Sequence, residues 1–177
     1  MKSGFQFKDL TYLGHGEQIQ FRFLDLMNNQ RMQWILPTWF TEHAAEIKNK
    51  LLPEFDKILT YQKYHDCGKY YCRTEQDGKV HYPNHAEISA QIWSKLSDDF
   101  HIMELIRDDM LCHTLKPSEA NTLAENKNCI ALICTALCEL HANAEMFGGL
   151  ESDSFKIKFK RLSKLGNNLF KLLKEKS

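Results

Sequence analysis

The run His65-Asp66-Cys67-Gly68-Lys69 is the densest group of chemically active side chains in the sequence. It places an imidazole beside a carboxylate at the predicted end of a helix, followed by a glycine and an amine. Adjacent residues on a helix point about 100° apart, so His65 and Asp66 can bind one metal ion together only where the helix ends. Because glycine permits a sharp turn, we expect Gly68 to bring Lys69 back towards the same pocket.

This run resembles the His-Asp-x-Gly-Lys signature of the HD superfamily of metal-dependent phosphohydrolases. The predicted hairpin that follows and the segment His85-Ala86-Glu87-Ile88-Ser89-Ala90 are also similar to the histidine-bearing helix start of many HD domains. The resemblance covers roughly residues 38–147, and the arrangement is similar to the HD domains of tRNA nucleotidyltransferases and of stand-alone nucleic-acid-end phosphatases. It implies an HD-domain helical bundle, an enzyme that hydrolyses phosphoesters, and a phosphorylated nucleotide or nucleic-acid end as its substrate.

The resemblance also implies roles for individual residues. His65 and Asp66 would bind one or two divalent ions, and Lys69 would hold a substrate phosphate, which makes Asp66 and Lys69 the catalytic candidates. Mixed histidine and carboxylate ligands suit Mn, Fe, Co, Ni or Zn, with Mg possible. Such a cation offsets the charge that develops during phosphoryl transfer. The alternative for this pair is a surface cap at a helix end.

Two histidines are candidates for the family's first metal ligand, which lies on the helix before the His-Asp pair. His43 fits by its place on the preceding helix, although its separation of 22 positions from His65 is slightly short for two antiparallel helices. The rival is His15, in Gly14-His15-Gly16-Glu17. His85 is the third candidate ligand, and its alternative role is a helix cap.

Further ligands are predicted downstream. Asp109 and His113 have i, i+4 spacing at the end of the helix expected over 98–112, so one helical face would present both to a second metal or a phosphate-bound water. The alternative is a surface pair. Where the family has an aspartate on a late apolar helix, this chain has Asn143, with His141 and Glu145 as possible substitutes. Because of this departure, a catalytically degenerate HD fold remains a second interpretation of the sequence.

The charge distribution predicts an anionic ligand near the C-terminal end. Residues 151–177 carry eight Lys or Arg against three acidic residues, so this segment has a net charge of +5 within a chain of net charge zero. Residues 154–161 alternate aromatic and basic side chains, so lysines could contact phosphates while Phe155 or Phe159 stacks on a base. The alternative is a helix whose apolar face packs on the bundle. The candidate substrate-binding residues are Lys69, Arg73, Lys79, Lys156, Lys158 and Arg161, with Tyr70, Tyr71 and Tyr82 as an opposite wall.

The elements that must position these residues are mostly helices. Apolar periodicity and capping signals predict helices over 17–28, 38–51, 53–64, 86–96, 98–112 and 128–147, another helix start at Pro117, and a basic helix over 154–175. Thr38 is the expected N-cap of the second helix. An Asp77-Gly78 turn between extended pieces at 70–72 and 79–82 predicts a small hairpin. The expected fold is a single all-α HD-type domain over 1–177, with a core over 38–147 and a β-hairpin insert.

Composition excludes several protein classes. With 43% hydrophobic and 26% charged residues in 177, the chain is not disordered. It has no apolar run of ~20 residues that would span a membrane, and its first residues lack the apolar region of a secretion signal, which predicts a cytoplasmic protein without membrane partners. The six cysteines form no CxxC pair and are predicted to be free structural thiols. The sequence does not predict the oligomeric state.

Three functions remain open on the sequence. The favoured one is metal-dependent hydrolysis of a phosphomonoester or phosphodiester. The second is a di-iron centre that oxygenates a small molecule, as in some HD proteins. The third is a degenerate HD fold that binds RNA or a protein partner through its basic C-terminal helix.

Overall fold

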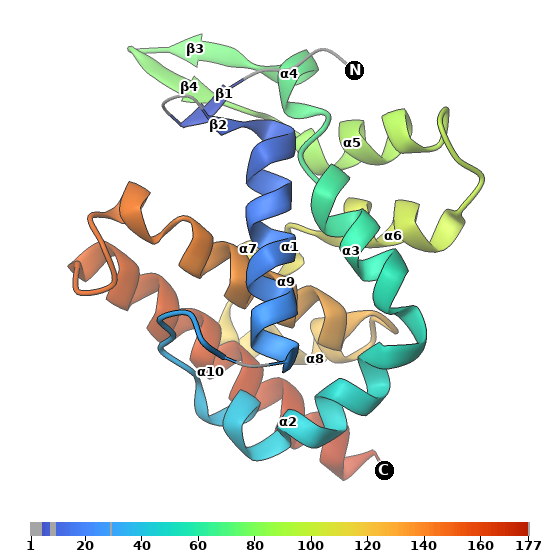
Figure 1. The fold of residues 1–177 in the computed structure, drawn as a ribbon, viewed down its shortest axis with the longest axis vertical. Helices are drawn as coiled ribbons and strands as arrows, with labels where there is room; N and C mark the ends of the chain where they lie inside the picture. Colours follow the sequence, from blue (N-terminus) through green and yellow to red (C-terminus); the bar gives the residue numbers. More distant parts are fainter. Residues whose placement is uncertain (1–4, 8–9, 29, 177) are drawn as a thin grey trace. The chain divides into compact units, whose positions relative to one another are not determined.

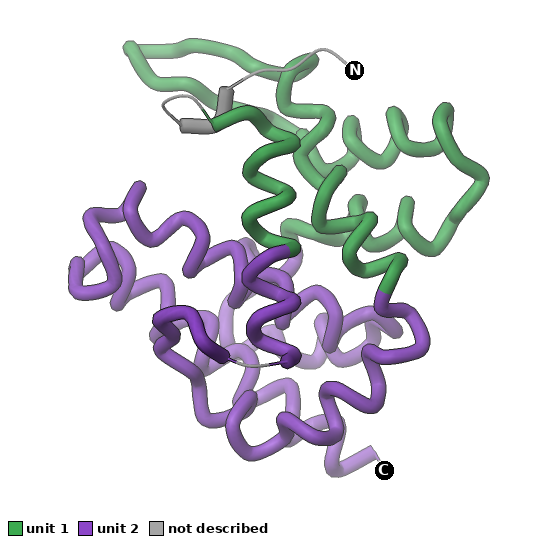
Figure 2. The backbone as a smooth tube through the Cα atoms, viewed as in Figure 1, with its two compact units in different colours: residues 1–20, 56–110 green, residues 21–55, 111–177 purple. Residues whose placement is uncertain are grey.

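The computed structural model describes residues 5–7, 10–28 and 30–176 and is mostly α-helical, with two short antiparallel hairpins (Figure 1). This confirms the predicted all-α fold with a small β-hairpin insert. The chain forms two compact units: unit 1 is residues 1–20 with 56–110, and unit 2 is residues 21–55 with 111–177 (Figure 2). The assignment of a single HD-type domain stays a prediction.

Unit 1 contains both hairpins and the helices around the His-Asp run. Its elements are β1 (Phe5–Phe7), β2 (Leu10–Thr11), the first part of α1 (Tyr12–Asn28), α3 (Phe55–Tyr64), α4 (Lys69–Cys72), β3 (Thr74–Gln76), β4 (Lys79–His81), α5 (His85–Trp93) and α6 (Phe100–Asp108). In the second hairpin Gln76 pairs with Lys79, and the turn residues Asp77 and Gly78 both have positive φ, as a two-residue hairpin turn requires. The Asp77-Gly78 turn and β4 lie where the sequence predicts them, whereas the β1–β2 hairpin was not expected.

One extended piece was predicted wrongly. Residues 70–72 are helical and form most of α4. Gly68 already has helical φ and ψ, and its carbonyl oxygen accepts a hydrogen bond from Tyr71 N at 2.9 Å. A helical turn therefore starts at Gly68 and includes residues 70–72, which were predicted to be extended because of their β-propensity.

Helices α1 and α3 approach each other closely within unit 1. A Cβ atom on Gly16 would overlap the carbonyl oxygen of Lys63 and lie 2.7 Å from that of Gln62, so only glycine fits there. Beside this contact, Gln20 Nε2 donates to Leu59 O at 2.7 Å. The close approach matters for function because it brings the start of α1 to the end of α3, where the His-Asp pair lies.

The helix predicted over 98–112 ends earlier. Asp99 caps α6 by accepting from the backbone N–H groups of His101 and Ile102. At the other end, Asp109 N donates to Ile106 O, an i→i−3 bond of the kind that tightens and ends a helix. Residues 111–114 then form a separate short helix, so the prediction that Asp109 and His113 share one helical face is wrong.

Unit 2 is built around its most buried helix, α9. Its elements are the rest of α1, α2 (Thr38–Leu51), η1 (Leu52–Glu54), α7 (Leu111–Thr114), η2 (Pro117–Glu119), α8 (Ala120–Ala124), α9 (Cys129–Ala142), η3 (Ala144–Phe147) and α10 (Asp153–Glu175). Every residue from 129 to 138 is buried, which confirms the apolar helix expected there. Gly148, with φ of 91°, ends the helical region as predicted.

Helix α10 packs on α2, α8 and α9, and it is the long helix at the red end of the colour scale in Figure 1. A Cβ atom on Gly166 would overlap the indole of Trp39, so α10 and α2 are also in close contact. Ser152 caps α10 by accepting from Phe155 N at 3.2 Å. The bounds of α2 are as predicted, but its N-cap is Pro37, and Thr38 is already helical.

All six cysteines are buried and free of disulfides, as predicted for structural thiols. Burial raises the pKa of the Cys67 thiol to about 11, so this neighbour of Asp66 stays protonated at neutral pH. Among the described residues, no helix combines the length and apolar character needed to cross a bilayer.

Candidate metal and phosphate site

The carboxylate of Asp66 is the centre of the candidate site. Asp66 lies in the turn after α3, which we call the HD turn (residues 65–68), and is 1% exposed. His65 Nε2 lies 3.3 Å from its Oδ2 atom, Lys69 Nζ lies 2.7 Å from the same oxygen, and His85 Nε2 lies 3.6 Å from Oδ1. Unit 1 thus brings three of the residues singled out by sequence to the buried carboxylate of a fourth, Asp66.

Both histidine rings are oriented by the backbone. His65 Nδ1 is 2.8 Å from the carbonyl oxygen of Gln62, and His85 Nδ1 is 3.0 Å from that of Tyr82. A carbonyl oxygen only accepts, so Nδ1 carries the proton in each ring, and in the neutral imidazole the lone pair is then on Nε2, the atom that faces Asp66. Metal-binding histidines are typically held in this way. Because His65 and Asp66 are both about 1% exposed, they do not form the surface cap considered above.

Gly68 allows α5 to reach the HD turn. The chain turns here and brings Lys69 back to Asp66 as expected, but the φ of −79° and ψ of −19° at Gly68 suit any residue, so the turn does not depend on the conformational freedom of glycine. The role of Gly68 is steric, because a Cβ atom would lie 2.5 Å from Ser89 N and 2.9 Å from His85 O. Gly68 N also donates to Ser89 Oγ at 2.8 Å. This contact holds the first turn of α5, and with it His85, against Asp66.

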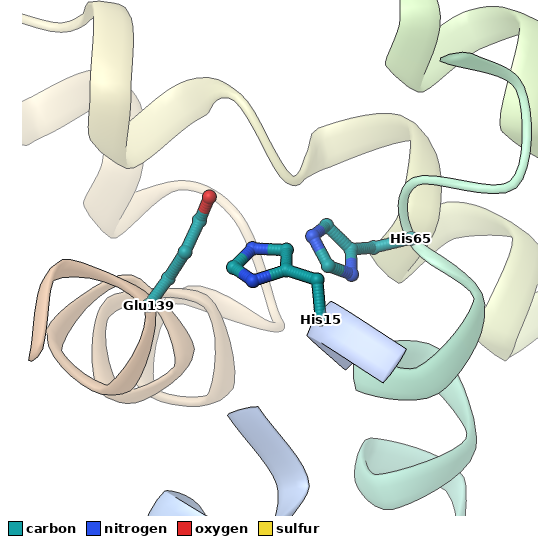
Figure 3. Close-up of side chains that lie close together, drawn as sticks. All are labelled: His15, His65 and Glu139. Atoms are coloured by element: carbon teal, nitrogen blue, oxygen red, sulfur yellow. The ribbon is translucent and has the colours of Figure 1, made fainter. Parts of the chain in front are cut away.

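Of the two candidates for a first histidine, the structure places His15 beside His65. His15 is fully buried on α1, and its ring centroid lies 5.7 Å from that of His65 (Figure 3). His43 is on α2 in unit 2, where its ring stacks on Phe170 at 4.7 Å and its Nδ1 lies 3.3 Å from Glu46 Oε2. The third side chain labelled in Figure 3 comes from α9 of unit 2 and is described below.

The ammonium group of Lys69 is held between a carboxylate and an aromatic ring. Its Nζ atom, 2.7 Å from Asp66, also lies 5.4 Å from the ring centroid of Tyr82, which is a cation–π distance. The Tyr82 hydroxyl accepts a hydrogen bond from Tyr12 at 3.2 Å. Burial, together with this hydrogen bond, raises the pKa of Tyr12, so this phenol stays uncharged at neutral pH.

The other proposed substrate contacts of unit 1 are exposed. Tyr70 and Tyr71 are 40% and 58% exposed on α4, and Lys79 is exposed on β4. Arg73 Nη2 lies 3.5 Å from Glu75 Oε2 in an exposed ion pair. Such a pair contributes little to stability, so Arg73 can exchange Glu75 for the anionic group of a ligand. These four side chains are accessible to a ligand, and their role in binding stays a prediction.

Glu139 is a polar residue that the sequence reasoning missed. In unit 2 its Oε2 lies 2.8 Å from His113 Nε2 on α7, and its Oε1 accepts from Asn143 Nδ2 at 3.5 Å. The sequence did contain a signal for it, an acidic residue within an otherwise apolar helix. Acidic residues are rarely buried without a partner, so a partner for Glu139 was to be expected.

Asp109, assigned to unit 1, is 4% exposed and accepts a hydrogen bond from the Tyr61 hydroxyl.

His141, one of the suggested substitutes for the family's aspartate, is structural. Its Nδ1 donates to Leu137 O at 2.9 Å, and its Nε2 accepts from Ile35 N at 3.1 Å, so both ring nitrogens are used. The ring packs 4.7 Å from that of Trp34 and 5.3 Å from that of Phe155. The expectation that His141 could act as a metal ligand is therefore not supported by its geometry.

We expect His141 to make folding stability depend on pH. Burial lowers its pKa from the ordinary 6.5 to about 4. The unfolded chain therefore takes up a proton first, and the stability that is complete above pH 6.5 should fall by about 2 kcal/mol between pH 6.5 and pH 5. Urea unfolding of the wild type and of His141→Phe across this range measures the effect. The variant loses the Ile35 bond, which lowers its stability equally at every pH, and it lacks the titrating imidazole, so its stability should fall less between pH 6.5 and pH 5. Parallel curves for the two proteins would contradict the prediction.

The basic C-terminal segment divides into packed and exposed residues. Phe155 is fully buried and stacks on Phe159 at 6.0 Å, so it is unavailable to a nucleobase, and the alternative of bundle packing is the right one for this face. Arg161 donates to Leu115 O at 2.6 Å and to Cys112 O at 2.7 Å, which gives its guanidinium a structural role at the end of α7, and its expected phosphate contact stays a prediction.

The two lysines expected to contact substrate from this segment remain on the surface. Lys156 Nζ lies 3.0 Å from Glu151 Oε2, and Lys158 Nζ lies 5.0 Å from the ring centroid of Phe147. Both side chains are exposed.

Comparison of the chain with models of protein families, with curated proteins and with solved structures found no match. The functional assignment therefore depends on the geometry of the site and on the residues of the His-Asp run.

Proposed function

We propose that this chain is an HD-type, metal-dependent phosphohydrolase that acts on a phosphorylated nucleotide or a nucleic-acid end. The observation that carries the proposal is that two histidines, each with Nδ1 bound to a backbone carbonyl, direct Nε2 towards one buried carboxylate. An ordinary packed histidine needs no such arrangement, and two of them on one aspartate form a convergent donor set.

The donor set fits a divalent transition metal. His65, His85 and Asp66 would hold it, with His15 beside His65, and two imidazole nitrogens with a carboxylate oxygen suit Mn, Fe, Co, Ni or Zn. When bound, such an ion supplies polarisation of a phosphoryl oxygen and charge compensation in the transition state. The hydrogen bonds from Nδ1 to Gln62 O and Tyr82 O keep both rings in the ligating tautomer.

Lys69 supplies the phosphate contact in this proposal. Its ammonium group is a compact point charge, 8% exposed for the residue as a whole, and its interaction with an anion is stronger there than in bulk water. Asp66 and the Tyr82 ring hold the side chain in place before a substrate arrives. Ordering that precedes binding lowers the entropic cost of capturing a phosphate.

Metal analysis followed by an activity screen tests the proposal. The purified protein, reconstituted separately with Mn, Fe, Co, Ni and Zn, should bind metal and hydrolyse at least one of these substrates: aryl phosphates, 2′,3′-cyclic nucleotides, deoxynucleoside triphosphates or 3′-phosphorylated oligonucleotides. His65→Ala should lose both properties, whereas His101→Ala, a histidine of α6 outside the site, should keep them. Activity of His65→Ala equal to that of the wild type would refute the assignment.

The same experiment separates the other two functions. Binding of iron with an optical charge-transfer band and no hydrolysis would indicate the di-iron oxygenase. If the protein binds no metal after any reconstitution, the degenerate HD fold is the remaining function. The carboxylate of Asp66 would then be neutralised by its basic neighbours alone.

A further inference from the structure

Five of the six exposed lysines of α10 form a single straight row, and the sixth, Lys158, lies on another side of the helix. At 3.6 residues per turn and 1.5 Å per residue, the positions of the five fall within an arc of about 80° over a length of about 27 Å. We call this row the lysine stripe, and its members, all exposed, are Lys156, Lys160, Lys164, Lys171 and Lys174.

The opposite face of α10 fixes the stripe in place. Phe155, Leu162, Leu165 and Leu169 are buried, and the helix packs on α2, α8 and α9 within unit 2. A helix held along its apolar face by three others cannot rotate, so the five charges keep their order and direction. The stripe is thus a preorganised surface.

Most of the positive charge of the lysine stripe is not offset by acidic side chains. No acidic residue lies in α10 between Asp153 and Glu175. Lys156 has an ion pair, with Glu151 at 3.0 Å, and both partners are well exposed. Within the described part of the chain, no ion pair joins any other lysine of the stripe to a carboxylate. Four neighbouring ammonium groups on one face repel each other, and a polyanion relieves that repulsion.

We propose that the lysine stripe binds the phosphodiester backbone of a single-stranded nucleic acid. Successive lysines are about 4.5 to 10.5 Å apart along the axis, and a flexible single strand can place its phosphates against such a row. Lysine acts as a point charge and makes no bidentate base contact, so binding should be largely independent of sequence. The inference goes beyond the proposed hydrolysis, because this contact requires neither the metal nor the HD turn.

A membrane surface fits the stripe less well. A helix that lies on a bilayer buries its apolar face in the lipid, and the apolar face of α10 is already buried against the other helices of unit 2. Ile157, 69% exposed, is the exposed large apolar residue of α10, and one such side chain anchors a helix weakly.

Fluorescence anisotropy with a labelled oligothymidylate, in the presence of a chelator and over a range of salt concentrations, tests the inference. Each lost phosphate contact should lower the slope of log K against log salt by about 0.7, so Lys160→Gln with Lys164→Gln should lower it by about 1.4 and weaken binding at physiological salt roughly tenfold. Lys160→Arg with Lys164→Arg keeps the charge and should bind as the wild type does. Lys95→Gln with Lys127→Gln removes two exposed lysines outside α10 and should leave the slope unchanged.

An unchanged slope in the Lys160→Gln, Lys164→Gln variant would overturn the inference, as would binding of phosphatidylserine vesicles or of polyglutamate in preference to the oligonucleotide. The chelator makes the result independent of catalysis. If the wild type hydrolyses aryl phosphates but fails to bind the oligonucleotide, this inference alone is wrong. If it binds the oligonucleotide but hydrolyses nothing, the proposed function alone is wrong.

Discussion

Asp66→Asn should bind no metal and should hydrolyse phosphoesters at least about 10³-fold more slowly, a loss of ~4 kcal/mol of transition-state stabilisation. Asparagine has nearly the same shape, so the HD turn can keep its backbone. What disappears is the negative charge that faces Nε2 of His65, Nε2 of His85 and Nζ of Lys69. A neutral amide oxygen is a poor ligand for a divalent cation, and the amide nitrogen would point a hydrogen-bond donor at one of these groups.

Isothermal titration with Mn or Zn and kcat/KM for an aryl phosphate measure the two effects. Asp98→Asn makes the same chemical change at an exposed position of unit 1 and should leave both unchanged. Because Lys69 loses its partner in Asp66→Asn, the folded fraction of the variant needs to be established first by circular dichroism. A folded Asp66→Asn protein that keeps its metal would show that the carboxylate is not a ligand.

Local periodicity predicted most of the fold because helix burial repeats every 3.6 residues. Helix α2 has the predicted bounds, and the apolar run that begins at Cys129 is the buried helix α9. The errors lie where a contact distant in sequence or a single backbone bond decides the outcome. The bond from Asp109 N to Ile106 O ends α6, and nothing in the hydrophobic pattern of 98–112 indicates it.

The candidate site was predicted only in part, for a similar reason. The HD turn and His85 could be found from residue types at short spacing. The choice between His15 and His43 could not, because it depends on which helix lies against α3. That choice is made by Gly16, whose missing side chain admits the backbone of α3. Spacing along the chain contains no information about this contact.

The basic segment shows how one pattern supports two structures. Alternating aromatic and basic residues over 154–161 have a period of two, which would place Phe155 and the lysines on opposite faces of an extended chain. In the observed helix, Phe155 and Phe159 are one turn apart on the packed side, and Lys156 and Lys160 are one turn apart on the exposed side. The lysine stripe therefore follows from helical geometry.

Gly68→Ala should destabilise the protein by about 3 kcal/mol and weaken metal binding at least about tenfold. The backbone of Gly68 is helical, so alanine would lower the free energy of the folded state relative to the unfolded one if the site had room. It has none, because the new Cβ atom would lie 2.5 Å from Ser89 N and 2.9 Å from His85 O. These are backbone atoms of α5, which can only move together with the helix. As α5 moves away, His85 Nε2 leaves Asp66, and the donor set loses a nitrogen.

Gly14→Ala is the matched control for this prediction. Its Cβ atom would meet Leu10 Cδ1 and Thr11 Oγ1 at 3.2 Å, and both are side-chain atoms that can shift. The gain in helix propensity should make this variant about as stable as the wild type. Urea unfolding gives the stabilities, and metal titration of the folded proteins gives the affinities. If Gly68→Ala and Gly14→Ala prove equally stable and bind metal equally well, α5 does not depend on the missing side chain, and His85 cannot be held at Asp66 by this contact.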